Sequence, residues 1–352
     1  MQVINWKRKI EYVEYSSDSL FGEECNQESN MDIRKNTNAI VESNTIEISF
    51  LKLFVNVAKS ILTRAHIYDK ETAAFARSYF NIIPFMLGEK NGYLVIDYNR
   101  KDILRDFSKT TRIGEIAQGI NYYLFRDKYD LRALYDFKYY LKRENSRACC
   151  SGKTPDYVLH YRDGSLGILE SKGTVKPNST ELVLKGREQC INGCSLIYHA
   201  NEKTVKNYYT SVVSFATSSP YIERNTCIYC VDPYNKFYTN GISEESDLLY
   251  EYSKWFYLAG AEKITNKLLR GEKLVPNDIK EMEKVGNEYI INSFVCGTSQ
   301  KNIARITFGM CKSVGDYLIT GDSSYISNIK GKYQINEEIF SDGTFIRVEK
   351  DR

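Results

Sequence analysis

Two short apolar segments, residues 156–161 (DYVLHY) and 166–173 (LGILESKG), are separated by a break that contains Arg162, Asp163 and Gly164. Their lengths and the glycine-containing break between them predict two strands joined by a tight turn. The geometry of that turn decides which side chains share a face of the hairpin, because side chains alternate along a strand. This hairpin therefore constrains the fold and chemistry of the chain more than any other segment.

The length of the turn determines where Asp156 points. A two-residue turn would pair positions whose numbers sum to 327 and would set Asp156 and Glu170 on opposite faces. A three-residue turn, with Gly164 in the left-handed conformation of a G1 bulge, makes the sum 326 and sets them opposite each other. Glycine adopts this conformation most readily. Lys172 lies two residues after Glu170, so we expect all three side chains on one face.

Two carboxylates and one amine at this spacing suit metal-assisted hydrolysis. Neighbouring carboxylates repel, which raises the pKa of at least one of them unless a cation lies between them. Mg²⁺ binds oxygen ligands and keeps water molecules that it acidifies. A lysine at such a site stabilises the charge that develops on a phosphate during hydrolysis. The hairpin therefore predicts a Mg²⁺ site, with Mn²⁺ as a substitute, that acts on phosphodiester bonds.

Residues 155–156 read Pro-Asp, thirteen residues follow, and residues 170–172 read Glu-Ser-Lys on an apolar strand. In this pattern the chain resembles the PD-(D/E)XK nuclease superfamily over roughly residues 105–262. The resemblance implies an α/β fold with a restriction-endonuclease-like core, in which helices flank a central mixed sheet. It also implies these roles: Mg²⁺ ligands for Asp156 and Glu170, the catalytic lysine for Lys172, and a further ligand in the backbone carbonyl of Ser171.

The same family often has an acid on a helix before the motif and a glutamine or lysine on a helix after it. Glu115 matches the first place and becomes a candidate catalytic metal ligand, although it lies opposite the apolar stripe of its helix, where a solvated glutamate is the alternative. Gln189, with Lys185 on the same helical face, matches the second place and becomes a candidate catalytic residue. Gly193 stands where some exonuclease branches have tyrosine, which favours an endonuclease.

The pattern of apolar residues predicts three consecutive segments: an N-terminal α/β module (1–105), the nuclease core (106–270) and a C-terminal α+β appendage (271–352). Within them we expect strands at 5–15, 92–98, 210–217 and 226–233, and helices at 49–68, 71–80, 131–145, 246–269 and 277–284. Two further helices are expected to begin at the N-caps Thr111 and Ser179.

The charge of the chain is modest, with a formal net charge of +3 and a pI of about 8.2. Lys and Arg outnumber Asp and Glu by 17 to 12 in residues 101–200, against 12 to 13 in residues 1–100. The segment that carries the motif is thus the basic one, which agrees with a nucleic-acid partner. Tyr122, Tyr123 and Tyr161 are candidates to stack on bases.

No phosphate-binding loop of the G-x4-G-K-[ST] type is present, so the chain does not look like an ATPase. The family resemblance implies a helicase or ATPase partner instead. A homo-oligomer is compatible with the sequence. The start of the chain lacks signal-peptide character and no apolar run is long enough to span a membrane, so we expect a cytoplasmic protein without a membrane partner. The nine cysteines lack the paired spacing of zinc fingers and are expected to be reduced, buried thiols.

The function expected from these features is a Mg²⁺-dependent nuclease that cleaves DNA, in bacterial restriction or anti-phage defence. Two alternatives remain open. One is a non-catalytic nucleic-acid-binding or scaffold subunit that keeps a nuclease-like fold, and the other is a nuclease directed at RNA. Intact Asp156, Glu170 and Lys172 argue against the first, and nothing in the sequence separates DNA from RNA.

Overall fold

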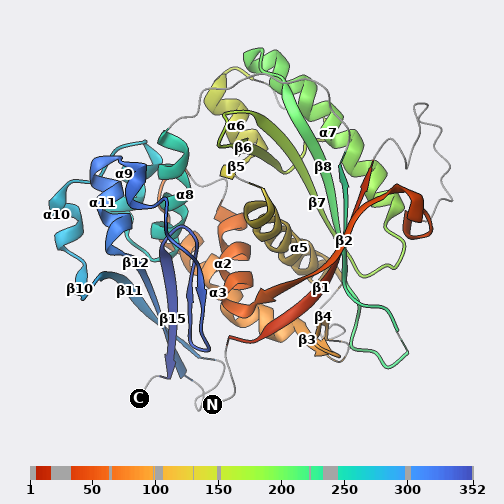
Figure 1. The fold of residues 1–352 in the computed structure, drawn as a ribbon, viewed down its shortest axis with the longest axis horizontal. Helices are drawn as coiled ribbons and strands as arrows, with labels where there is room; N and C mark the ends of the chain where they lie inside the picture. Colours follow the sequence, from red (N-terminus) through yellow and green to blue (C-terminus); the bar gives the residue numbers. More distant parts are fainter. Residues whose placement is uncertain are drawn as a thin grey trace. The chain divides into compact units, whose positions relative to one another are not determined.

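The computed structural model describes residues 5–16, 33–62, 66–97, 99, 106–129, 131–148, 152–221, 223–232, 245–297 and 303–350. The chain forms two compact units (Figure 1). The large-sheet unit contains the described parts of Arg8–Ile48 and Pro84–Ser243. The C-terminal-sheet unit contains those of Met1–Lys7, Ser49–Ile83 and Glu244–Arg352. These units do not coincide with the three consecutive segments 1–105, 106–270 and 271–352, because the chain passes between them more than once.

The large-sheet unit is a mixed sheet of nine strands with helices packed on it. The strands run in the order β3-β4-β1-β9-β8-β7-β6-β5, and β2 pairs with β1. Their bounds are β1 (Lys7–Ser16), β2 (Ile40–Ser49), β3 (Leu87–Lys90), β4 (Tyr93–Ile96), β5 (Leu131–Asp136), β6 (Tyr157–Tyr161), β7 (Leu166–Thr174), β8 (Val205–Ser214) and β9 (Cys227–Asp232). The expected mixed α/β class with a central mixed sheet is confirmed.

Two long helices lie on opposite faces of this sheet beside β7 and β8 (Figure 1). They are α5 (Asp106–Lys128) and α7 (Thr180–Asn201), and a short helix, α6 (Phe137–Glu144), follows β5. The apolar stripe of α5, which includes Ile113, Ile116 and Ile120, is buried as its period predicts. The sheet is thus covered on both sides at the strands that carry the Pro-Asp and Glu-Ser-Lys residues.

Parallel and antiparallel pairs alternate irregularly across the sheet. β7 and β8 run parallel because α7 connects them, whereas β6 pairs antiparallel with both β5 and β7. At the other side, β1 pairs parallel with β9, from Glu11 opposite Cys227 to Ser16 opposite Asp232. Residues near the start of the chain therefore complete the same sheet as the hairpin.

Several predicted elements need correction. Residues 131–145, expected to be one helix, are a strand followed by a helix, because β5 pairs with β6 and the Asp136 side chain then caps α6 by accepting from the Tyr139 amide at 2.9 Å. Thr111 lies inside α5 and not at its N-cap. Ser179 is the N-cap residue of α7, but its side chain makes no capping hydrogen bond.

The helix expected at 246–269 is two helices, α8 (Glu245–Leu258) and α9 (Glu262–Leu269), because Gly260 has a φ of +73° between them. The C-terminal-sheet unit also contains α2 (Phe50–Ile61), the first part of α3 (Lys70–Met86), α10 (Pro276–Lys280) and α11 (Lys312–Thr320). Its antiparallel sheet has the order β10-β11-β12-β15-β14-β13. Those strands are β10 (Glu283–Val285), β11 (Glu288–Gly297), β12 (Ile303–Cys311), β13 (Lys332–Tyr333), β14 (Glu337–Ile339) and β15 (Thr344–Lys350).

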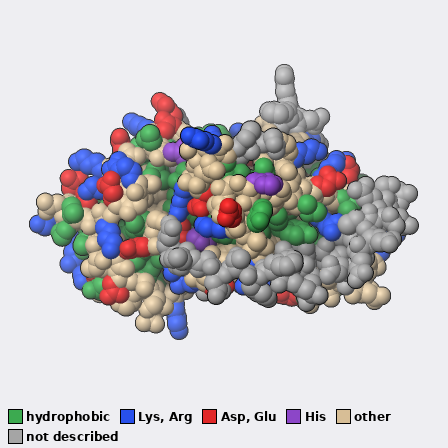
Figure 2. All heavy atoms as spheres, turned by 90° about the horizontal axis from the view of Figure 1, so that it is seen from above, with side chains coloured by type: hydrophobic (Ala, Val, Ile, Leu, Met, Phe, Trp, Pro, Cys, Tyr) green, Lys and Arg blue, Asp and Glu red, His purple; other side chains and the backbone are tan. Residues whose placement is uncertain are grey.

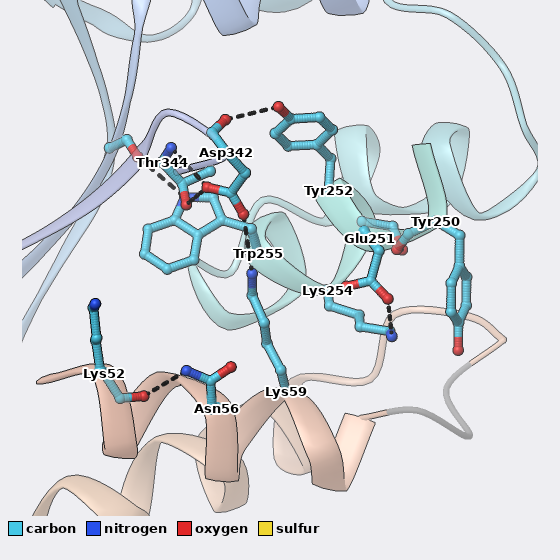
Figure 3. Close-up of polar contacts among 12 residues, drawn as sticks. Lys52, Asn56, Lys59, Tyr250, Glu251, Tyr252, Lys254, Trp255, Asp342 and Thr344 are labelled. Atoms are coloured by element: carbon cyan, nitrogen blue, oxygen red, sulfur yellow. Dashed lines mark hydrogen bonds and ion pairs between the residues drawn. The ribbon is translucent and has the colours of Figure 1, made fainter. Parts of the chain in front are cut away.

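Buried charges in the C-terminal-sheet unit are paired within the unit (Figure 3). Lys59 of α2 lies 3.6 Å from Asp342, and its Nζ is 5.4 Å from the centre of the Trp255 ring. Lys254 contacts Glu251 one helical turn earlier at 2.7 Å. The Lys59 contacts connect α2 with α8 and the loop before β15, whereas the Lys254–Glu251 ion pair lies within α8. In the part of the chain that the structure describes, no helix combines the length and apolar character needed to cross a bilayer.

Candidate functional site

The β6–β7 hairpin has the predicted register. Tyr157 pairs with Leu169 and Val158 with Ile168, so the numbers of paired residues sum to 326. Gly164 has a φ of +80°, and its amide donates to the Tyr161 carbonyl at 3.0 Å. The three-residue turn is therefore confirmed, and the same register extended by one residue would place Asp156 opposite Glu170.

Glu170 lies deep in the large-sheet unit, with 1% of its surface exposed. One side of its side chain lies against α7, because a Cβ built on Gly186 would be 3.2 Å from Glu170 Cγ. The Lys172 ammonium contacts Glu170 Oε1, as expected for strand residues two apart. Apart from this ion pair, neither carboxylate oxygen has a well-formed hydrogen bond, which is uncommon for a buried polar group.

Asp156 is held at the same place by main-chain contacts. Its Oδ2 accepts from the Ser171 amide at 3.0 Å, and its carbonyl accepts from the Phe137 amide at 3.0 Å. Burial and the neighbouring negative charge of Asp156 together raise the pKa of Glu170 to about 8, and Lys172 opposes this shift. The structure thus brings Asp156, Glu170 and Lys172 together in a buried, partly uncompensated cluster.

Glu115 does not join this cluster. Its carboxylate pairs with Arg112 on α5 at 2.9 Å. Within the described ranges, no group of three or more His, Cys, Asp or Glu side chains is arranged to hold a metal ion. The two carboxylates at the end of the hairpin therefore stand without a third acidic ligand among these residues, and a metal role for Glu115 remains a prediction.

Gln189 lies on α7 beside the segment that precedes Asp156. Its Nε2 donates to the Thr154 carbonyl at 2.8 Å, so it contacts backbone and not the carboxylates. Lys185, four residues earlier, is exposed and pairs with Glu181. The structure thus connects Gln189, but not Lys185, with the hairpin.

Ser171 faces the opposite helix from Glu170. Its Oγ accepts from Asn121 Nδ2 of α5 at 2.7 Å, while its amide donates to Asp156. Asn121 also exchanges hydrogen bonds with Ser211 of β8, so this buried amide fixes two neighbouring strands. The sequence signal that could have identified Asn121 is a polar side chain next to the apolar stripe of a long helix. The role of the Ser171 carbonyl as a ligand stays a prediction.

Other candidate side chains are part of the core. Tyr122 is fully buried and meets the Tyr157 ring edge-on, with ring centres 6.2 Å apart, so its proposed stacking on bases is wrong. His160 is buried, in keeping with a packed histidine. Cys227 and Cys230 lie in β9 as expected and are buried free thiols, while Cys149 and Cys150 lie outside the described residues.

A cavity of about 270 Å³ lies in the same unit but away from the carboxylates. Its lining includes Tyr12, Glu42, Tyr123 and Lys128, and none of the hairpin residues. Lys128 pairs with Glu14 and Glu42 there, and the lining also includes Glu47 and Asp127, so the cavity is lined by more acidic than basic side chains. On the face in Figure 2, acidic and basic side chains are interspersed, and the described residues show no extended patch of one sign.

No protein-family model matches the chain, and comparison with curated proteins and with solved structures also finds no match.

Proposed function

We propose that this chain is a Mg²⁺-dependent nuclease that hydrolyses phosphodiester bonds of DNA, with a restriction-endonuclease-like core formed by the β6–β7 hairpin and its neighbours. The observation that carries the proposal is the Glu170 carboxylate, which is 1% exposed, lacks well-formed hydrogen bonds and lies beside Asp156 and Lys172. A structural hairpin has no need of two acids and a lysine at a buried end, because burying charges without full hydrogen bonding costs stability.

The residues present fit a small divalent cation. Asp156 and Glu170 supply the oxygen ligands that Mg²⁺ prefers, and a bound cation would offset both causes of the raised Glu170 pKa, which are burial first and then the negative charge of Asp156. The Ser171 amide orients the Asp156 carboxylate, as hydrogen-bond donors around metal ligands do. When bound, the cation would supply Lewis acidity and acidify a water molecule. Mg²⁺ keeps several waters, so two protein ligands are compatible with it.

Lys172 contributes a positive charge that is not fully buried. Its side chain is 28% exposed while that of Glu170 is 1% exposed, so its ammonium lies on the solvent side of the carboxylate. A phosphate that approaches from solvent meets this charge. We assign to Lys172 stabilisation of the charge that develops at the phosphorus and orientation of the attacking water.

The alternative function, a non-catalytic nucleic-acid-binding or scaffold subunit, is favoured by one observation. Among the described residues no third acidic, His or Cys side chain completes the pair of carboxylates, and Glu115 pairs with Arg112 instead. This alternative predicts DNA or RNA binding without cleavage. By family analogy alone we place the nuclease in bacterial restriction or anti-phage defence, beside a helicase or ATPase partner.

A nicking assay on supercoiled plasmid tests the proposal. We expect conversion to open-circular DNA with Mg²⁺ or Mn²⁺, no conversion with EDTA, and no conversion by Asp156→Ala with Mg²⁺. A parallel assay on single-stranded RNA compares the rate of RNA cleavage with the rate of DNA cleavage and so shows which substrate is preferred. Wild-type protein that binds DNA but never nicks it with either metal would support the scaffold alternative.

A further inference from the structure

We propose that Gln189 and Asn192 of α7 are positioning residues, which hold residues 153–155 so that Asp156 meets Glu170. This inference rests on the proposed nuclease function for its catalytic consequence, but its structural part stands separately. It changes the role of Gln189 from a catalytic residue to one that acts through Asp156, and it adds Asn192, which the sequence did not single out.

The two amides contact consecutive carbonyl oxygens. Gln189 Nε2 donates to the Thr154 carbonyl at 2.8 Å, and Asn192 Nδ2 donates to the Lys153 carbonyl at 2.9 Å. Residues three apart on a helix lie on the same face, so the two side chains reach one segment together. Residues 153–155 form no helix or strand, and these bonds replace the contacts that regular structure would provide.

Gly193 gives the segment room to approach α7. A Cβ at Gly193 would lie 2.6 Å from Pro155 Cγ and 2.9 Å from its Cδ, closer than real side chains approach. The proline ring thus packs directly on the helix backbone, next to the two amide contacts. The glycine that replaces the tyrosine of some exonuclease branches has a steric purpose here.

Asp156 follows this held segment directly. Its carbonyl accepts from the Phe137 amide and its Oδ2 accepts from the Ser171 amide, each at 3.0 Å. Four successive residues, 153–156, are therefore fixed from α7, α6 and β7. If the contacts from α7 are lost, the position of the Asp156 carboxylate depends on the remaining two bonds. Loss of such supporting contacts typically weakens metal binding or activity by about 10- to 100-fold.

The Ser171 amide offers a readout that does not depend on catalysis. Because it donates to Asp156 Oδ2, its hydrogen exchange reports whether Asp156 stays in place. The test compares full-length wild type with the neutral, similarly sized variants Gln189→Met and Asn192→Leu and with the double variant. Asp156→Ala shows the exchange rate without the acceptor. Glu188→Gln and Ser195→Ala, on exposed positions of α7, are the matched controls.

We expect Ser171 exchange to accelerate at least about 10-fold in the double variant, with Mn²⁺ affinity and kcat on plasmid reduced by about 10-fold and KM for DNA unchanged. Gly193→Ala should give the same pattern without altering either amide. The inference is overturned if the Ser171 amide exchanges at the wild-type rate in a folded double variant while it exchanges fast in Asp156→Ala. If wild type neither binds Mn²⁺ nor cleaves, the proposed function fails, while the Ser171 exchange still decides whether α7 positions Asp156.

Discussion

The Ser171 amide donates to Asp156 Oδ2 at 3.0 Å, which ties the residue before β6 to the middle of the Glu-Ser-Lys sequence on β7. The backbone amide of Ser171, which lies between Glu170 and Lys172, thus donates a hydrogen bond to the carboxylate of Asp156. An orienting bond of this kind fixes a carboxylate before any cation arrives, which reduces the rearrangement needed on binding.

Lys172→Ala should slow plasmid nicking by about 100-fold or more, since a positioned charge near a developing phosphorane contributes at least that much. DNA binding and the melting temperature should change little, because the lysine is partly exposed. Lys185→Ala, which removes an exposed lysine paired with Glu181, is the matched control and should cleave at the wild-type rate. Equal rates for both variants would remove the basis for a catalytic lysine.

The stability of the metal-free protein should fall as pH rises from about 4.5 to about 8. The Glu170 carboxyl has a pKa of about 8 in the folded protein and ionises near 4.5 when unfolded, so the folded state holds the extra proton in this interval. Glu170→Gln cannot ionise and should show a flatter dependence. Melting temperatures of both proteins in EDTA from pH 4 to pH 9 measure this. Parallel curves would show that the Glu170 carboxyl is not perturbed by burial.

Glu115→Gln distinguishes a metal ligand from a surface glutamate. Because Glu115 already pairs with Arg112 on a partly buried turn of α5, its replacement should leave the nicking rate within about two-fold of wild type. Asp156→Ala shows how large a loss of activity to expect when a proposed metal ligand is removed. If the two variants lose activity equally in Mg²⁺ titrations, Glu115 moves to the metal when the cation binds.

Gly173→Ala should destabilise the protein and slow cleavage. A Cβ there would lie 2.7 Å from Ala117 Cβ and 2.8 Å from the Ile113 carbonyl oxygen, so β7 and α5 would have to separate just beyond Lys172. Overpacking of this kind typically costs about 1–3 kcal/mol. Gly114→Ala, in the same helix with no atom within 4 Å of the new Cβ, should instead stabilise by about 0.5–1 kcal/mol. Urea unfolding of both variants gives the two free energies.

Local chemistry explains what could be predicted from the sequence. The register of β6 and β7 depends on the three-residue turn between them. Gly164 favours this turn because glycine readily adopts the positive φ that the turn requires. The helical content of 131–136 was overestimated because that segment becomes a strand only by pairing with β6 across 20 or more residues. Tertiary pairing of this kind overrides local propensity.

The supporting residues of the site were harder to foresee. Asn192 reaches the Lys153 carbonyl across 39 residues, and an asparagine on a helix surface gives no sign of such a partner. Gln189 was found through a family pattern, but its contact with backbone required coordinates. Glu115 fitted the same pattern, yet the structure pairs it with Arg112.

The parallel pairing of β1 with β9 has a consequence for how the protein is made and dissected. β1 leaves the ribosome early, but its partner residues Cys227–Asp232 are synthesised more than 200 residues later, so the large sheet cannot close until then. The C-terminal-sheet unit likewise needs α2, which is encoded before α5. A single cut between residues 243 and 244 therefore leaves the first fragment with every segment of the large-sheet unit, but it separates Met1–Lys7 and Ser49–Ile83 from the rest of the C-terminal-sheet unit. A shortened protein that keeps the large-sheet unit intact must carry Arg8–Ile48 and Pro84–Ser243 in one chain, with a linker in place of residues 49–83.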